Sequence, residues 1–192
     1  MIMKKFNTRR GFTLIETMVA ITILTLAISG AFMTANSSMT AAETSRGKLT
    51  ASYLAQEGIE YVRMMRDDSY LNAYYLGGTD TSSAAWADFT TGGNYWSITK
   101  CIAKTCTLDP AKDLADSPLQ QCSGTSCTPL YLATNGTYTQ QNVAGSTLTP
   151  FTRTIQVIDV TNNDKKIVST VSWFYHTTQY SVTIIDHLTP WQ

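Results

Sequence analysis

The chain has 192 residues, no formal net charge and only 15% charged side chains, so its length allows one domain plus an extended element. All four charges of the first eleven residues are basic, which leaves the remainder mildly acidic and gives no electrostatic reason to expect nucleic-acid binding. Sparse charge with plentiful Thr and Ser is more typical of an exported β-rich domain than of a cytosolic enzyme.

A long apolar segment follows the basic cluster. From Phe12 to Met33 the only charged side chain is Glu16. A helix of this length crosses the ~30 Å hydrocarbon core at ~1.5 Å per residue, and the basic flank predicts that the C-terminus faces away from the cytoplasm. A cleavable secretory signal has a shorter apolar run with its cut site behind it, whereas a plain signal anchor remains an alternative. Placing an unpaired carboxylate in an apolar segment costs free energy, so the presence of Glu16 indicates a specific role for it.

Helical character continues through residues 39–69. This stretch lacks proline and places apolar side chains at helical spacing, with charged ones opposite. An amphipathic half that packs on a globular domain is therefore predicted. The expected apolar stripes contain Leu49, Tyr53, Leu54, Ile59, Tyr61, Val62 and Met65, and the expected charged face includes Glu57, Arg63, Arg66 and Asp67.

Residues 70–192 predict an extracytoplasmic β-rich domain. The Gly- and Thr-rich composition of 76–94 predicts an irregular connection. Strand signals follow at 95–100, at 129–132 before an Asn-Gly hairpin turn, and in three alternating segments over 151–184. The three segments predict an antiparallel meander with one face on the helix, and Trp191 is expected to dock onto that sheet. The predicted fold class is α+β.

Four cysteines form two C-x4-C pairs, and no residue pattern indicates catalysis. An even number of cysteines outside the cytoplasm indicates disulfides; three pairings are possible, and the two local ones are favoured. Zinc, whose usual knuckles have two to four residues between the cysteines, is the alternative, but the oxidising exterior favours disulfides. No nucleophile elbow, phosphate-binding glycine loop or His-x-x-x-His pattern occurs, so we expect no enzyme activity, no catalytic residue and no metal or other cofactor. The candidate disulfide residues are Cys101, Cys106, Cys122 and Cys127.

Residues 11 to 16, Gly-Phe-Thr-Leu-Ile-Glu, resemble the N-terminus of type IV prepilins and pseudopilins. The resemblance implies that 1–11 form a leader peptide, which prepilin peptidase removes by cutting between Gly11 and Phe12, and that Phe12 is N-methylated. It also implies that 12–38 form a transmembrane and filament-core helix. Glu16 would then guide assembly by pairing with the Phe12 amine of a neighbouring subunit. The implied pilin fold has a long N-terminal helix packed against a C-terminal antiparallel β-sheet.

Two further segments, 54–63 and 149–192, resemble PilV-like minor pilins. The resemblance implies a structural subunit of a type IV pilus-like filament, a minor pilin, whose partners are other pilin subunits, prepilin peptidase/methyltransferase and an inner-membrane assembly platform. The chain would span the inner membrane once and then join an extracellular pilus or a periplasmic pseudopilus.

Other interpretations remain open. A pseudopilin of a type II secretion or DNA-uptake system shares the N-terminus. A signal-anchored extracellular binding module or enzyme would keep its N-terminus uncut and would not need Glu16. An exposed subset of the aromatic side chains would favour adhesion.

Overall fold

The computed structural model describes residues 11–77, 81–93, 97–123 and 127–191. The chain divides into two compact units, Met1–Ser45 and Arg46–Gln192, and helix α1 contributes to both. The α+β class is confirmed. In chain order the elements are α1 (Leu14–Tyr75), α2 (Thr81–Thr91), η1 (Thr99–Cys101), β1 (Thr105–Leu108), η2 (Leu114–Asp116), β2 (Leu119–Gln121), β3 (Tyr131–Leu132), β4 (Tyr138–Thr139), β5 (Thr147–Leu148), β6 (Thr152–Thr161), β7 (Asp164–Tyr175) and β8 (Thr178–Leu188).

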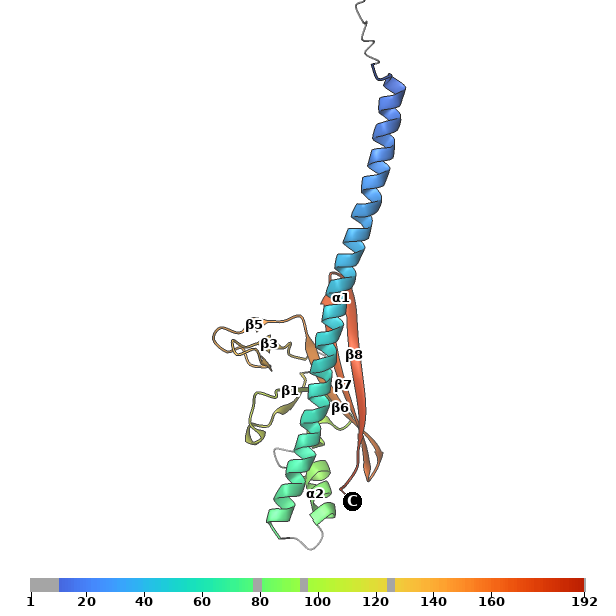
Figure 1. Cartoon of the computed structure of the whole chain (residues 1–192). Coiled ribbons are helices and arrows are strands. Elements are labelled where there is room, and N and C mark those ends of the chain that lie inside the picture. The colour runs from blue at the N-terminus through green and yellow to red at the C-terminus, as the bar shows by residue number, and fades with distance from the viewer. Residues whose placement is uncertain (1–10, 78–80, 94–96, 124–126, 192) are drawn as a thin grey trace, which may run out of the picture. The chain divides into compact units, whose positions relative to one another are not determined.

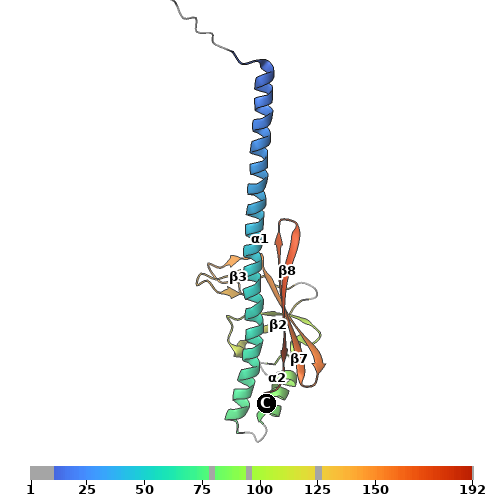
Figure 2. The ribbon, with the colours of Figure 1, turned by 45° about the vertical axis from the view of Figure 1, so that its right-hand side comes forward.

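The second unit is built on a five-stranded antiparallel sheet of order β2-β1-β6-β7-β8 (Figure 1). The predicted meander of three long strands is thereby confirmed. A smaller antiparallel sheet has the order β4-β3-β5, and Gly136, with a φ of 85°, lies in the predicted hairpin turn between β3 and β4. In the view of Figure 2, β3 is seen to the left and β8 to the right of the part of α1 that belongs to this unit.

Two segments differ from the expectation. Instead of an irregular connection, residues 81–91 form helix α2, because Ala85, Trp86 and Phe89 recur at helical spacing and are buried. The strand expected at 95–100 does not form in its described part, since Ser97 and Ile98 lie outside any element and Thr99 begins η1. Residues 95 and 96 lie outside the described residues.

The C-terminal tail packs on a helix rather than on the sheet, which corrects the expectation for Trp191. The indole ring lies 4.7 Å from the guanidinium carbon of Arg66 and 5.7 Å, between centroids, from the ring of Tyr70. The Ser82 hydroxyl donates a hydrogen bond to the backbone carbonyl of Trp191. The tail therefore joins α1 to α2.

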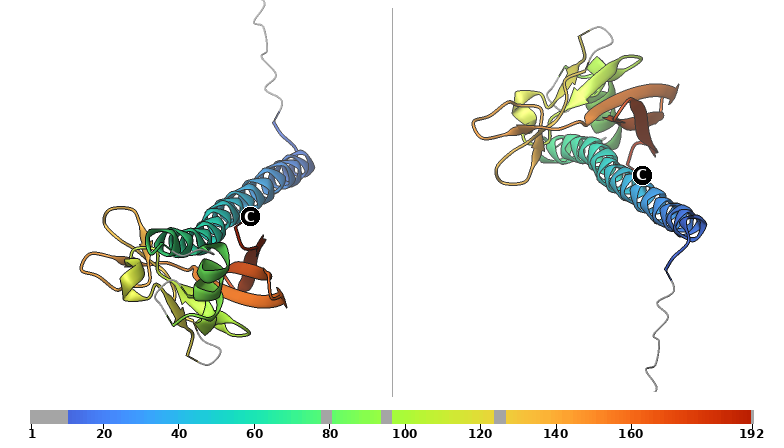
Figure 3. Two further views of the ribbon diagram at one scale, coloured as in Figure 1. Left: turned by 90° about the horizontal axis from the view of Figure 1, so that it is seen from below. Right: turned by 90° about the horizontal axis from the view of Figure 1, so that it is seen from above.

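One stripe of α1 packs on the sheet, and the strands gather on that side of the helix (Figure 3). Its residues recur every three or four positions, as a helix with one buried face requires. Leu49 and Tyr53, which were expected to be buried, lie off this stripe and are 58% and 66% exposed. The buried residues are Ala51, Leu54, Ala55, Gly58, Ile59, Val62, Met65 and Ser69.

Gly58 lies at the closest approach of helix and sheet. A Cβ atom at this position would lie 2.6 Å from the Ser169 hydroxyl oxygen and 3.0 Å from Cδ1 of Ile155. Even the smallest side chain would therefore force the helix away from β6 and β7. Gly47 plays a similar part, since its Cβ would lie 2.8 Å from Nε1 of Trp173.

A buried arginine on β6 joins three segments at the same place. Arg153 is 0% exposed. Its Nη1 donates to the Leu54 carbonyl at 3.1 Å and to the Glu57 carboxylate at 2.5 Å, and its Nη2 donates to the Leu108 carbonyl at 2.8 Å. Burial lowers the pKa of Arg153, and the carboxylate of Glu57 opposes that effect.

Substituting Gly58 by alanine should destabilise the second unit. Alanine normally stabilises a helix by ~1 kcal/mol over glycine, but overpacking of a close contact costs ~1–3 kcal/mol, so we expect a lower free energy of unfolding. Denaturant unfolding of the full chain in detergent, followed by tryptophan fluorescence, measures this. Gly30→Ala is the matched control, because nothing lies within 4 Å of the added Cβ. Equal curves for the two variants would contradict the close approach.

Arg153→Ala should cost at least ~3 kcal/mol of unfolding free energy, since it leaves a cavity and removes every bond of the buried guanidinium. Glu57→Gln should cost ~1 kcal/mol or less, because the Glu57 side chain is 43% exposed and the amide oxygen still accepts a hydrogen bond. The same denaturant titration compares the two variants. Similar losses for both would mean that the ion pair, rather than the buried arginine, holds the helix.

Candidate assembly site

The N-terminus of α1 is capped by Thr13. Its hydroxyl oxygen accepts the backbone N–H of Glu16 at 3.4 Å, and its carbonyl accepts the N–H of Thr17 at 3.2 Å. Thr-x-x-Glu is the sequence pattern of a capping box. The start of α1 after Thr13 could therefore have been predicted from the sequence, but we did not predict it. Glu16 consequently lies in the first turn of α1, where the helix dipole favours a negative charge. Gly11 and Phe12 precede the helix.

The first unit presents an apolar surface. Every side chain of residues 11–43 is exposed, and that of Phe12 is 81% exposed. By length and composition, α1 contains a stretch able to cross a membrane. Apolar exposure on this scale indicates contact with lipid or with other proteins. The large apolar side chains are Phe12, Leu14, Ile15, Met18, Val19, Ile21, Ile23, Leu24, Leu26, Ile28, Phe32, Met33 and Met39.

The hydroxyl side chains of this segment are satisfied within the helix. Thr17 donates to the Leu14 carbonyl at 2.8 Å, and Thr22 donates to the Val19 carbonyl at 2.8 Å. Ser29 donates to the Thr25 carbonyl at 2.6 Å. Because these groups need no water, they do not interrupt the apolar character of the segment.

Glu16 is the one charged side chain in this apolar surface. From residue 11 to residue 42 it is the only acidic or basic side chain, and no partner of its carboxylate occurs among the residues that the structure describes. A carboxylate in an apolar setting is stable only when a cation or hydrogen-bond donors accompany it. The geometry thus leaves Glu16 available to a positive group from outside the described chain.

The cysteines form two local disulfides. Cys101 is bonded to Cys106, which links η1 to β1, and Cys122 is bonded to Cys127 beyond β2. All four thiols are consumed, so none remains for zinc. Within the described ranges, no group of three or more His, Cys, Asp or Glu side chains could hold a metal ion.

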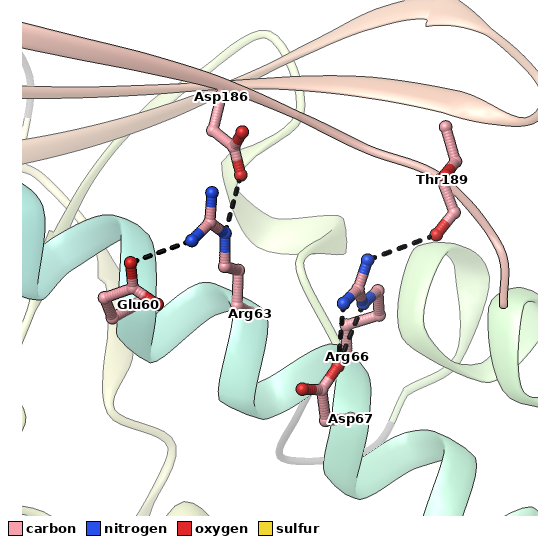
Figure 4. A network of polar contacts seen from close by, with 6 residues as sticks. All are labelled: Glu60, Arg63, Arg66, Asp67, Asp186 and Thr189. Carbon is pink, nitrogen blue, oxygen red and sulfur yellow. Dashed lines mark hydrogen bonds and ion pairs between the residues drawn. The ribbon is translucent and has the colours of Figure 1, made fainter.

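Two arginines hold the end of β8 on α1 (Figure 4). Arg63 Nε donates to the Asp186 carboxylate at 2.9 Å, and its Nη1 donates to Glu60 at 2.8 Å. Arg66 pairs with Asp67 at 2.9 Å and donates to the Thr189 carbonyl. Arg63 and Arg66 were expected on the charged face opposite the apolar stripes, but they contact β8 and the tail that follows it. The hydrogen bond to Asp186 raises the pKa of Arg63.

Other perturbed groups lie along the opposite flank of α1. Burial raises the pKa of Tyr61, and Asp109 adds to that effect; the Tyr61 hydroxyl donates to the Lys112 carbonyl at 3.0 Å. Burial also raises the pKa of Asp68, helped by the adjacent charge of Asp67. Neither Tyr61 nor Asp68 lines either of the two cavities described next, so the two groups do not form a common site.

Among its described residues, the second unit has open cavities on two different surfaces. One, of about 460 Å³, lies between α2 and the β6–β7 turn and includes Trp86, Asn162 and Lys165 in its lining. The other, of about 430 Å³, is lined by Thr50, Tyr53, Leu54, Glu57 and Tyr138. Neither lining contains a histidine or a cysteine. Instead, Nδ1 of the exposed His187 lies 2.9 Å from Oδ1 of Asp164, the first residue of β7, and His176 lies in the β7–β8 turn.

Comparison with known proteins agrees with the N-terminal geometry. Residues 6–32 match the family model of the prokaryotic N-terminal methylation motif. The match spans Gly11, Phe12 and Glu16 and most of the apolar segment, and it supports a type IV pilin-like subunit. No curated protein and no solved structure matches the chain.

Proposed function

We propose that this chain is a structural, non-catalytic subunit of a type IV pilus-like filament, assembled through the apolar half of α1. The observation that carries the proposal is the methylation motif at residues 6–32, which ends inside an exposed apolar helix with a single acid. Such a helix needs a covering of lipid before assembly and of other helices afterwards. The partners are then other pilin-like subunits, a prepilin peptidase/methyltransferase and a membrane-bound assembly platform.

Processing takes place between Gly11 and Phe12, with methylation of the new Phe12 amine. Both residues are exposed and lie before the first residue of α1, so the peptide bond is not held in a helix. Gly11 has no Cβ, which lets the backbone enter a narrow peptidase site. Removal of residues 1–11 deletes the basic cluster and places a positive amine next to the apolar helix.

Glu16 pairs with the Phe12 amine of a neighbouring subunit. An amine at the N-terminus of α1 adds positive charge where the helix dipole is already positive, so it favours a nearby anion. The unpartnered carboxylate of Glu16 supplies that anion from the next subunit. One ion pair per contact would then set the axial register, because any other register leaves both charges in an apolar surrounding.

We further propose that the subunit is a minor pilin, on the resemblance of 54–63 and 149–192 to PilV-like proteins. It spans the inner membrane once before assembly, with the second unit outside. A pseudopilin of a type II secretion or DNA-uptake system is the second candidate, which the same N-terminus supports equally.

Processing predicts a defined N-terminus. In protein from sheared cell-surface material, intact-mass and peptide mass spectrometry should find a chain that begins at methylated Phe12. A processed chain confined to the membrane fraction would favour the pseudopilin. An uncut chain that begins at Met1 would remove the pilin-like function altogether.

Glu16→Gln should leave membrane insertion intact but lower incorporation into filaments about tenfold or more. The amide has the same shape without the charge, and a charge-assisted hydrogen bond contributes ~1.5–3 kcal/mol, of which ~1.4 kcal/mol is tenfold in an equilibrium. Quantitative immunoblots of sheared and membrane fractions measure the ratio. Glu16→Asp keeps the charge and should restore part of the incorporation. Normal incorporation of Glu16→Gln would exclude the pairing.

A further inference from the structure

Strand β8 is a long outer strand without the usual protection. It pairs with β7 through an unbroken register from Lys165↔Leu188 to Tyr175↔Thr178, whereas the β6–β7 pairing contains a shift. The opposite outer strand, β2, has only three residues. Proteins commonly protect a long edge with a bulge, a proline or charged side chains. β8 has no proline, and residues 178–185 carry no charge.

The register identifies the backbone groups that face outward. β7 and β8 join through a two-residue turn, which is flanked by a hydrogen-bonded pair, here Tyr175 with Thr178. Hydrogen-bonded pairs recur at every second residue, so even-numbered residues of β8 bond to β7. Among the described residues, no other backbone group forms a hydrogen bond with the backbone groups of β8 that face away from β7. The outward groups belong to Gln179, Ser181, Thr183, Ile185 and His187.

The inner face of β8 is incompletely covered. On β7, Val171 is 0% exposed and Trp173 is 3% exposed. Their direct neighbours on β8, Val182 and Tyr180, pack against the same apolar cluster but are only partly buried. Ile184 shows the same partial burial. One more strand beside β8 would cover this row and extend the apolar layer between the sheet and α1.

We propose that the β8 edge binds an extended strand from a different protein by β-strand addition. Main-chain hydrogen bonds to the outward groups supply the attraction, and the flanking side chains select the partner. The partner strand is neutral over about five residues, because a charge beside 178–185 would lose hydration without a counter-charge. Its apolar side chains alternate on the face toward α1. Asp186, paired with Arg63, and His187, beside Asp164, mark the end of the site.

A second copy of β8 is the competing occupant. Two antiparallel β8 strands would be related by a two-fold axis and would close into a dimer. Subunits of a filament make head-to-tail contacts instead. The choice of a foreign strand over a second β8 therefore rests on the proposed function.

The probe is a fluorescent peptide, acetyl-Thr-Val-Thr-Ile-Thr-Val-Thr-amide, titrated against the full chain in detergent and followed by anisotropy. We expect saturable binding that Thr183→Pro weakens about tenfold or more, because proline removes an outward N–H. Thr183→Val keeps that N–H, is the matched control, and should bind like the parent chain. Ser181→Pro repeats the test at a second outward position. A peptide N-methylated at alternate residues should not bind.

Several outcomes would overturn the proposal. These are absence of peptide binding, equal binding by folded Thr183→Pro and Thr183→Val, and equal binding of the N-methylated peptide. The last comparison decides the matter if both proline variants fail to fold. Disulfide cross-linking between copies of Thr183→Cys in membranes would identify β8 itself as the occupant. No filament enters the peptide titration, so its result is separate from that of the N-terminal processing experiments.

Discussion

The burial of one guanidinium group against a helix backbone governs the packing of the second unit. Arg153 reaches the Leu54 carbonyl only because Gly58 lets α1 approach β6 and β7 without a side chain between them. A buried charge without such partners would cost several kcal/mol, so the contact tolerates little displacement. The position of α1 and the end of β1 at Leu108 are consequently fixed relative to β6.

Much of the fold follows from periodicity in the sequence, and the exceptions have physical reasons. The long strands alternate with period two, and the Asn135-Gly136 turn was readable from its residues. Helix α2 was missed because Gly and Thr around it suggested a loop, while tertiary burial of Trp86 and Phe89 stabilises the helix. Arg153 stands on the apolar face of its strand by simple alternation, but no sequence rule states which distant carbonyls a buried arginine will meet.

The candidate site could be proposed from the sequence more directly than the domain. The roles proposed for Gly11, Phe12 and Glu16 rest on chemistry that is local in the chain, namely a cut site, a new amine and one acid in an apolar run. Surface features such as the β8 edge depend on strand order, which arises from contacts between distant segments. The stripe of α1 that packs on the sheet was only partly predicted. Leu49 and Tyr53 are apolar or aromatic, as buried residues usually are, but they lie on a side of the helix that does not face the sheet.

The span of the Arg153 contacts also bears on how the chain folds. Its partners lie 45 and 96 to 99 residues earlier in the sequence. Contacts of such high sequence separation form late and slow the folding of a domain, because the intervening chain must first be ordered. The second unit therefore cannot complete its core until β6 has been synthesised. Until then the apolar stripe around Gly58 on α1 remains exposed. The time needed to synthesise the chain up to β6, more than the final stability of the unit, therefore decides how long that surface is open to aggregation.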